Sequence, residues 1–118
     1  MLSEILSRRN EILLAVIFGG FVESKIFRDI DIAVFTGYKI PYDKVELYEE
    51  ELSKLLESMV NLPIDVKVID YAPPYFREKA LNGIVLAERE PALTARLKFK
   101  SHQEIEDIKF KIRRTTSS

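Results

Sequence analysis

The sequence predicts an α/β (α+β) fold in which helices pack against a small mixed β-sheet. Two apolar runs rich in β-branched residues, ILLAVIF at 12–18 and IDIAVF at 30–35, are typical of buried strands. Further along the chain, helix-length patterns alternate with strand-length ones. The chain has 118 residues, so we expect a single domain spanning 1–118.

The N-terminal half predicts two helices and two strands. Residues 2–10 favour a short helix, capped by Ser3, because the apolar side chains fall on one side. Strands are expected at 12–18 and 30–35. A long amphipathic helix is expected at 43–59, where apolar residues recur at helical spacing. Its opposite face is rich in Glu and is interpreted as a solvated face.

The C-terminal half predicts two more strands and two more helices. Residues 64–70 alternate apolar with polar, as a strand does, and 84–87 form a shorter strand. A helix is expected at 74–81, between a Pro pair and an Asn-Gly stop. After Pro91 the apolar spacing predicts a last amphipathic helix, broken near Ser101 and followed by a frayed tail.

The connections predict how the strands pair. The link between strands 12–18 and 30–35 is too short for a helical crossover, so these two strands should pair antiparallel. The helix at 43–59 is long enough for a crossover and therefore permits a parallel pairing of strand 64–70. The sheet should thus be mixed.

Composition excludes several kinds of site. The chain has no cysteine and only one histidine, His102, which excludes a thiolate metal site and makes a Ser-His-Asp triad implausible. The formal net charge is -1, so the chain as a whole lacks the excess of positive charge typical of nucleic-acid-binding proteins, and we expect no nucleic-acid partner. The apolar run 12–22 is too short to cross a bilayer, and Glu4 and Glu11 do not suit a signal peptide. We therefore expect a cytoplasmic protein with no membrane partner.

Three aspartates are the candidate chemical groups. Asp29 and Asp31 flank Ile30, so their side chains share one face at the start of a strand. Adjacent carboxylates repel each other, and a divalent cation such as Mg²⁺ would neutralise them. Asp65 opens a later strand and could join the cluster. The alternative is a solvated strand end, with Asp65 forming an ion pair with Lys67.

The order of the motifs is more specific than any one of them. A buried strand ends at Gly19-Gly20, where backbone N–H groups could approach a phosphate or simply form a turn. The segment FGG-FVESKIFR-DIDIAV is followed by the long predicted helix and then by PIDVKVID, which contains Asp65. In this order the sequence resembles the minimal nucleotidyltransferases of the DNA polymerase beta-like superfamily, over about residues 1–90.

The resemblance implies a fold and a reaction. The fold would be nucleotidyltransferase-like, and the reaction would be Mg²⁺-dependent transfer of a nucleoside monophosphate, AMP from ATP, to an acceptor hydroxyl. Asp29 and Asp31 would hold one or two Mg²⁺ ions, and Asp65 would complete the metal site and help to activate the acceptor. Gly19 and Gly20 would contact the triphosphate.

The sequence also departs from the family pattern between its two motifs. Many relatives have Ser at the position of Gly20 and an Ala-Arg-Gly triplet soon after. Here the loop 21–28 lacks that triplet. Lys25 or Arg28 could supply the missing positive charge to a bound nucleotide, or they could be ordinary surface charges. The departure puts turnover and nucleotide choice in question more than the fold.

Partners follow from the resemblance and from the C-terminal segment. Many similar proteins are encoded as pairs with a helical HEPN-type protein and act as its antitoxins, some by attaching AMP to it. The segment 91–118 is basic, whereas 1–90 is acidic overall, so its amphipathic helix could bind a partner, a second copy or its own domain. Two alternatives to an enzyme remain. One is a catalytically silent module that neutralises or scaffolds a partner. The other is a structural domain with ion-paired acids.

Overall fold

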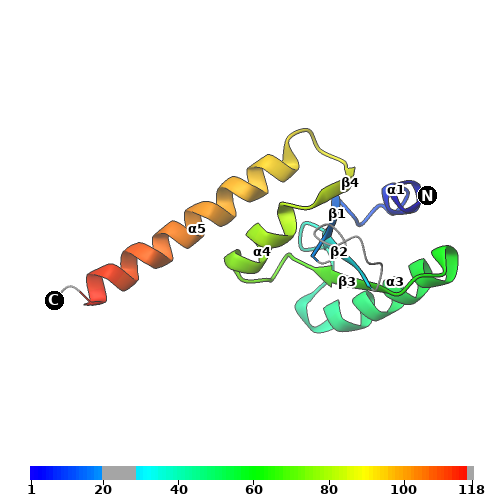
Figure 1. Ribbon diagram of the computed structural model, residues 1–118, viewed down its shortest axis with the longest axis horizontal. Coiled ribbons are helices and arrows are strands. Elements are labelled where there is room, and N and C mark those ends of the chain that lie inside the picture. The colour runs from blue at the N-terminus through cyan, green and yellow to red at the C-terminus, as the bar shows by residue number, and fades with distance from the viewer. Residues whose placement is uncertain (20–28, 117–118) are drawn as a thin grey trace.

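The computed structural model describes residues 1–19 and 29–116 (Figure 1). Four strands form one mixed sheet in the order β3-β2-β1-β4. The order of helices and strands agrees with the sequence prediction over the described residues. The elements are α1 (Leu2–Ser7), β1 (Leu14–Phe18), β2 (Ile30–Phe35), the 3-10 turn η1 (Tyr42–Lys44), α3 (Val45–Val60), β3 (Ile64–Val68), α4 (Pro74–Leu81), β4 (Ile84–Glu88) and α5 (Leu93–Thr116).

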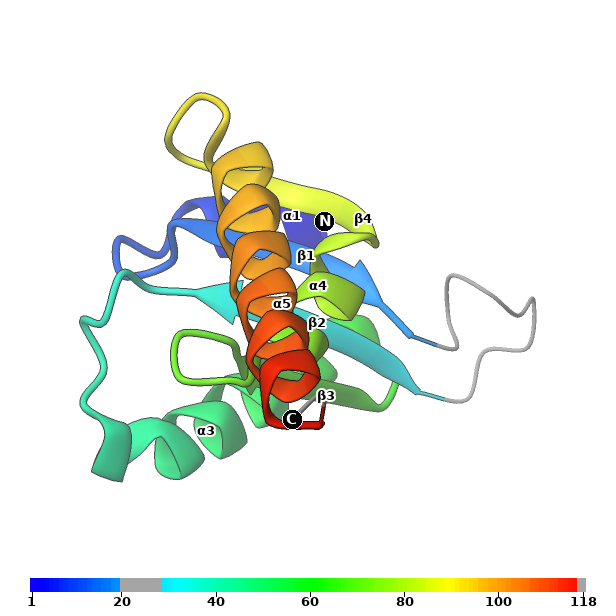
Figure 2. The same cartoon turned by 90° about the vertical axis from the view of Figure 1, so that its left-hand side faces the viewer.

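Helices cover both faces of the sheet, which explains why β1 and β2 are apolar on both sides. One face carries a core containing Leu6 of α1 together with Leu52 and Leu56 of α3. The other face carries a core containing Ala80 of α4 and Leu93 of α5. In Figure 2, α4 and α5 lie in front of the sheet on this second face.

The strand pairings confirm the predicted mixed sheet. β1 pairs antiparallel with β2, and β2 pairs parallel with β3 after the crossover through α3. β4 adds antiparallel to the free side of β1. The start of β2 and the start of β3 therefore meet at the same end of the sheet, beside the end of β1.

Asp70 fastens the opposite end of the β2–β3 pair. Its buried carboxylate accepts hydrogen bonds from the Thr36 N–H at 3.0 Å, the Thr36 hydroxyl at 3.1 Å and the Tyr38 N–H at 2.6 Å. Thr36 and Tyr38 belong to the turn that follows β2, and Asp70 follows β3. Because a buried carboxylate is costly unless it is hydrogen-bonded, this arrangement ties the two strand ends together.

The outer edge of β3 is closed by side chains of α3. The backbone N–H groups of Ile64, Val66 and Val68 donate to Glu57 at 3.0 Å, Ser53 at 3.0 Å and Glu49 at 2.8 Å, respectively. Four residues of helix rise about 6 Å and two residues of strand about 6.6 Å, so the two spacings match. The interpretation of the Glu-rich face as merely solvated is therefore wrong for Glu49 and Glu57.

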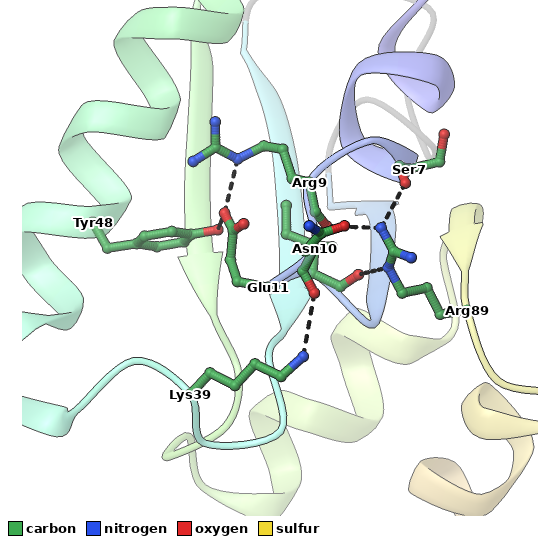
Figure 3. A network of polar contacts seen from close by, with 8 residues as sticks. Ser7, Arg9, Asn10, Glu11, Lys39, Tyr48 and Arg89 are labelled. Atoms are coloured by element: carbon green, nitrogen blue, oxygen red, sulfur yellow. Dashed lines mark hydrogen bonds and ion pairs between the residues drawn. The ribbon is translucent and has the colours of Figure 1, made fainter.

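Arg89 joins β4 to the N-terminal segment (Figure 3). It follows β4 directly, and its guanidinium donates to the carbonyl oxygens of Ser7 at 2.8 Å, Ile12 at 3.0 Å and Arg9 at 3.2 Å. These carbonyls lie at the end of α1 and in the connection to β1. Carbonyls in such positions have no partner within a helix or sheet, so Arg89 satisfies them and holds α1 beside β4.

A second contact in Figure 3 joins this connection to α3. The Glu11 carboxylate accepts hydrogen bonds from the Arg9 guanidinium and the Tyr48 hydroxyl, each at 2.8 Å. Burial alone would raise the pKa of Glu11, but these hydrogen bonds outweigh it and leave the pKa lowered. Burial also raises the pKa of Tyr48, and the hydrogen bond to Glu11 raises it further. The contact therefore favours a carboxylate and a neutral phenol.

Two details of the sequence prediction are wrong. α5 is continuous through Ser101, whose buried hydroxyl donates to the Leu97 carbonyl at 2.8 Å instead of interrupting the helix. Ser3 does not cap α1, because Met1 occupies the N-cap and the Ser3 hydroxyl donates to the Leu86 carbonyl of β4. In both cases a hydroxyl expected to bind locally, or to end a helix, has another partner.

α5 extends well beyond the body of the protein (Figure 1). Its last buried residue is Ile105, and every residue from 106 to 114 is exposed. Ile108 and Phe110 lie in this projecting part and are 37% and 59% exposed. No helix within residues 1–19 and 29–116 is long and apolar enough to cross a membrane.

The edge closure by α3 predicts a specific loss of stability. Ser53→Ala should lower the free energy of unfolding by about 1 kcal/mol, because the Val66 N–H loses its partner. The triple variant Glu49→Ala, Ser53→Ala, Glu57→Ala should also aggregate, because an uncovered strand edge pairs with other chains. Urea unfolding and light scattering measure the two effects. Glu46→Ala on the same helix is the control, and an equal loss there would contradict the explanation.

Candidate active site

Three predicted aspartates meet at the end of the sheet where β2 and β3 begin. Asp31 of β2 is the register partner of Phe18 in β1 and of Asp65 in β3. Asp29 directly precedes β2 and is exposed. Residues two apart in a strand share a face, and residues paired across a parallel ladder do so as well. Asp29, Asp31 and Asp65 therefore all lie at the face covered by α4.

Gly19 gives the Asp31 carboxylate room at the end of β1. Its φ is +77°, in the left-handed region that side chains rarely adopt. A Cβ built on Gly19 would lie 2.7 Å from Oδ2 of Asp31. Glycine is thus required here by both conformation and space. The sequence motif is explained physically, because the turn and the carboxylate pack directly against each other.

The remaining predicted site residues, Gly20, Lys25 and Arg28, lie outside the described residues. Their predicted contacts with the nucleotide therefore stay predictions.

Burial and neighbouring negative charges both disfavour the ionised form of Asp31. Burial raises the pKa of the Asp31 carboxyl above its ordinary value, and the negative charges of Asp65 and Asp29 raise it further. The positive charges of Lys67 and Lys79 act in the opposite direction without cancelling the effect. The ionised Asp31 therefore lacks compensation, and a cation placed here would relieve it.

Asp65 forms the ion pair that the sequence allowed as an alternative. Its Oδ1 lies 3.8 Å from Nζ of Lys67, and the two side chains are 54% and 48% exposed. Across residues 1–19 and 29–116, no three His, Cys, Asp or Glu residues form a group that could hold a metal ion. In this arrangement the aspartates are neighbours but not a formed metal centre.

The donor set nevertheless fits Mg²⁺. This ion prefers carboxylate oxygens and keeps several water ligands, so one or two carboxylates suffice to bind it. The uncompensated charge on Asp31 favours a cation. An exposed ion pair such as Asp65–Lys67 contributes at most about 1 kcal/mol, so Asp65 can turn toward the metal at little cost. Asp29 and Asp31, with Asp65 after this rotation, are the residues that could hold it.

A groove runs from Asp65 along the outer edge of β3. Two cavities of about 210 and 470 Å³ share the side chains of Glu46, Glu49 and Lys67. The smaller cavity includes Asp65, and the larger extends to Tyr42. Of the three aspartates, Asp65 lines the smaller cavity, whereas Asp29 and Asp31 line neither of the two.

Lys79 is a site residue that the sequence prediction missed. It lies in the last turn of α4, and its charge acts on the Asp31 carboxyl. Its neighbours in sequence form an ordinary helix and carry no motif. Only the packing of α4 across the sheet brings this lysine to the aspartates, so no local signal could have identified it.

The fold and this site define the chain as a nucleotidyltransferase-type domain. Residues 1–92 match the family described as Polymerase beta, Nucleotidyltransferase, so the chain belongs to this family. The match ends where α5 begins. The predicted resemblance is confirmed for the family and for the fold. No match was found among curated proteins.

Solved structures of toxin–antitoxin complexes contain similar chains. A toxin–antitoxin structure with AMP-PNP matches with a TM-score of 0.75 and 19% identity, covering 97% of this chain and 92% of that chain. A structure of a tri-AMPylated HEPN toxin with MNT antitoxin from Shewanella oneidensis has a TM-score of 0.70 and 19% identity, with the same coverage of 97% and 92%. The MntA-HepT toxin–antitoxin matches with a TM-score of 0.66 and 17% identity, covering 89% and 80%. At these identities the similarity establishes the fold.

The repulsion at Asp31 predicts a pH-dependent stability. A raised pKa in the folded state means that protonated Asp31 favours folding, and that this contribution is lost as pH rises through the folded-state pKa. Asp31→Asn should therefore stabilise the chain at neutral pH in a chelator, by up to about 1 kcal/mol. The gain should shrink as pH falls toward the ordinary pKa of Asp. Urea unfolding from neutral to acidic pH measures it, and destabilisation by Asp31→Asn at neutral pH would contradict the assignment.

Proposed function

We propose that this chain is a Mg²⁺-dependent nucleotidyltransferase that transfers AMP from ATP to a hydroxyl group of a partner protein. One observation carries the proposal: Asp31 and Asp65 are register partners beside the Gly19 turn, in a chain of the nucleotidyltransferase family. Three carboxylates at one sheet end are suited to binding divalent cations and phosphates together. The similar structures with AMP-PNP and with an AMPylated toxin support the choice of nucleotide and reaction.

The proposed reaction assigns a role to each residue. Asp29 and Asp31 hold Mg²⁺, which when bound neutralises the phosphates and polarises the phosphoryl oxygens. The backbone at Gly19 and Gly20 binds the triphosphate. Asp65 completes the metal site and accepts the proton of the acceptor hydroxyl, whose oxygen bonds to the α-phosphorus while pyrophosphate leaves.

We infer that two cations of the connecting loop complete the nucleotide site. Lys25 and Arg28 would add positive charge to the triphosphate site, in place of the arginine that many relatives carry there. Their charges would offset part of the charge that the phosphates bring to the aspartates.

We further propose that the partner is a helical HEPN-type protein and that the chain acts as its antitoxin. The similar structures are toxin–antitoxin complexes, and one contains a HEPN toxin. The projecting end of α5 supports a protein partner, because Ile108 and Phe110 are exposed on a basic helix that lies beyond the family match. Exposed apolar side chains of this kind are typical of interaction surfaces.

Labelled ATP tests the reaction. Incubation of the chain with α-labelled ATP, Mg²⁺ and the HEPN-type protein encoded beside it should transfer label to that protein. Asp31→Asn should reduce the rate by at least about 100-fold, because the metal loses a ligand and its charge compensation. Asp43→Asn, an exposed carboxylate at the far end of the groove, is the matched control.

The same experiment separates enzyme from binding module. If the wild type transfers no label while it and Asp31→Asn neutralise the toxin equally, the chain acts as a catalytically silent module and the proposed reaction is wrong.

The projecting helix gives a separate prediction. Ile108→Asp combined with Phe110→Asp should weaken the complex with the HEPN-type protein by at least about 100-fold, because charges would replace buried apolar contacts. The melting temperature of the isolated chain should stay unchanged, since both side chains are exposed. Size-exclusion chromatography and calorimetry measure these effects. Tyr42→Asp, which is 75% exposed on another surface, is the control. Loss of binding only in the control would place the interface elsewhere.

A further inference from the structure

α4 directs one lysine toward the candidate active site. Its C-terminal end lies at the end of the sheet that carries the aspartates. Gly83, just after α4, packs directly against β1: a Cβ on this glycine would lie 1.9 Å from the Ile17 carbonyl oxygen. About two turns earlier, Phe76 packs edge-on against Phe18, with ring centroids 5.7 Å apart. Phe18 is the register partner of Asp31. The helix therefore passes directly over the site.

The position of Lys79 on α4 follows from helix geometry. Residues three apart are neighbours on a helix surface, so Lys79 lies beside Phe76 and one turn nearer to Gly83. The flank of α4 that faces α5 is marked by Arg77, which pairs with Glu104. Successive helix residues are turned by 100° about the axis. Viewed along the helix, Arg77 therefore lies to one side of Phe76, which faces the sheet, and Lys79 lies to the other side. It is thus turned away from α5 and left open at the site.

Lys79 carries a positive charge that no nearby carboxylate neutralises by direct contact. It is exposed and forms no ion pair with any carboxylate within residues 1–19 and 29–116. Lys67, the other lysine whose charge acts on Asp31, is paired with Asp65 as long as that carboxylate is not turned toward a metal. A cation held near a metal-binding carboxylate, without an ion pair of its own, is suited to an anionic substrate that arrives with the metal.

We propose that Lys79 binds the phosphate chain of the nucleotide and supplies a positive charge to the site from α4. The inference rests on the proposed nucleotidyltransferase function and adds a substrate-binding residue to it. The lysine ammonium acts as a mobile point charge with three donors, so it can follow the phosphates without a fixed bidentate geometry. Its contribution should grow with the number of charges on the phosphate chain.

Calorimetry on the full chain with AMP-PNP and with AMP, both in Mg²⁺, tests the assignment. Lys79→Met should weaken AMP-PNP binding about 10- to 100-fold, the range for a lost hydrogen bond to a charged group, and should affect AMP much less. Lys79→Arg should recover most of the affinity because the charge is kept. Lys39→Met removes an exposed lysine beyond the end of β2, at the opposite end of the sheet from the aspartates, and should leave both affinities unchanged. Melting temperatures of all variants verify that each is folded.

The outcomes separate this inference from the function on which it rests. If the wild type binds AMP-PNP and Lys79→Met binds it equally well, the lysine assignment is overturned while the nucleotidyltransferase proposal stands. An equal loss for AMP and AMP-PNP also overturns it, because the effect would not follow the phosphate charge. If the wild type does not bind AMP-PNP with Mg²⁺, the proposed function fails and the role of Lys79 fails with it.

Discussion

The parallel register between β2 and β3 is the constraint on which the candidate site depends. Side chains alternate along a strand, so a slip of one residue would turn Asp65 to the opposite face of the sheet from Asp31. The register is held at its beginning, where the Ile30 N–H donates to the Pro63 carbonyl at 3.0 Å. It is held at its far end by the buried Asp70, which binds the turn after β2. The contacts at the two ends of the β2–β3 pair therefore keep Asp31 and Asp65 on the same face of the sheet.

The closure of the β3 edge serves the same constraint from outside. A parallel edge strand offers every second N–H to solvent, and an unprotected edge can slip or pair with another chain. The hydrogen bonds from Ile64 and Val68 to side chains of α3 tie β3 to the crossover helix that precedes it. Helix and strand are thus joined by side-chain hydrogen bonds. The same Glu49 that closes the edge also lines the groove beside Asp65.

The environment of Asp31 lowers the stability of the folded chain while it favours cation binding. Burial raises the pKa of Asp31, the negative charges of Asp65 and Asp29 raise it further, and the two lysines compensate only in part. A site with unmet negative charge costs folding free energy and favours cation binding at the same time. The open Lys79 and the paired Lys67 differ accordingly. Lys79 forms no ion pair within residues 1–19 and 29–116, and Lys67 pairs with Asp65.

Local patterns were sufficient for the elements but not for their side-chain contacts. The helix at 74–81 and the antiparallel pairing of the first two strands were predicted correctly, because a Pro start, an Asn-Gly stop and a short connection act locally. The expected break at Ser101 was wrong, because its hydroxyl bonds within the helix. Glu49 and Glu57 were interpreted as solvated, because their partners are backbone N–H groups of another element.

The sequence by itself determined the family and the order of strands and helices. It also determined that the two aspartates of the DID motif share a face, since spacing along a strand decides which side chains point the same way. Tertiary structure alone decided that Asp65 lies beside Asp31 and that Gly19 must lack a side chain because a carboxylate occupies the space. It also decided that the charge of Lys79 on α4 acts on Asp31. The physical reason is that these relations depend on strand register and on helix packing. Both are set by contacts between residues far apart in the chain.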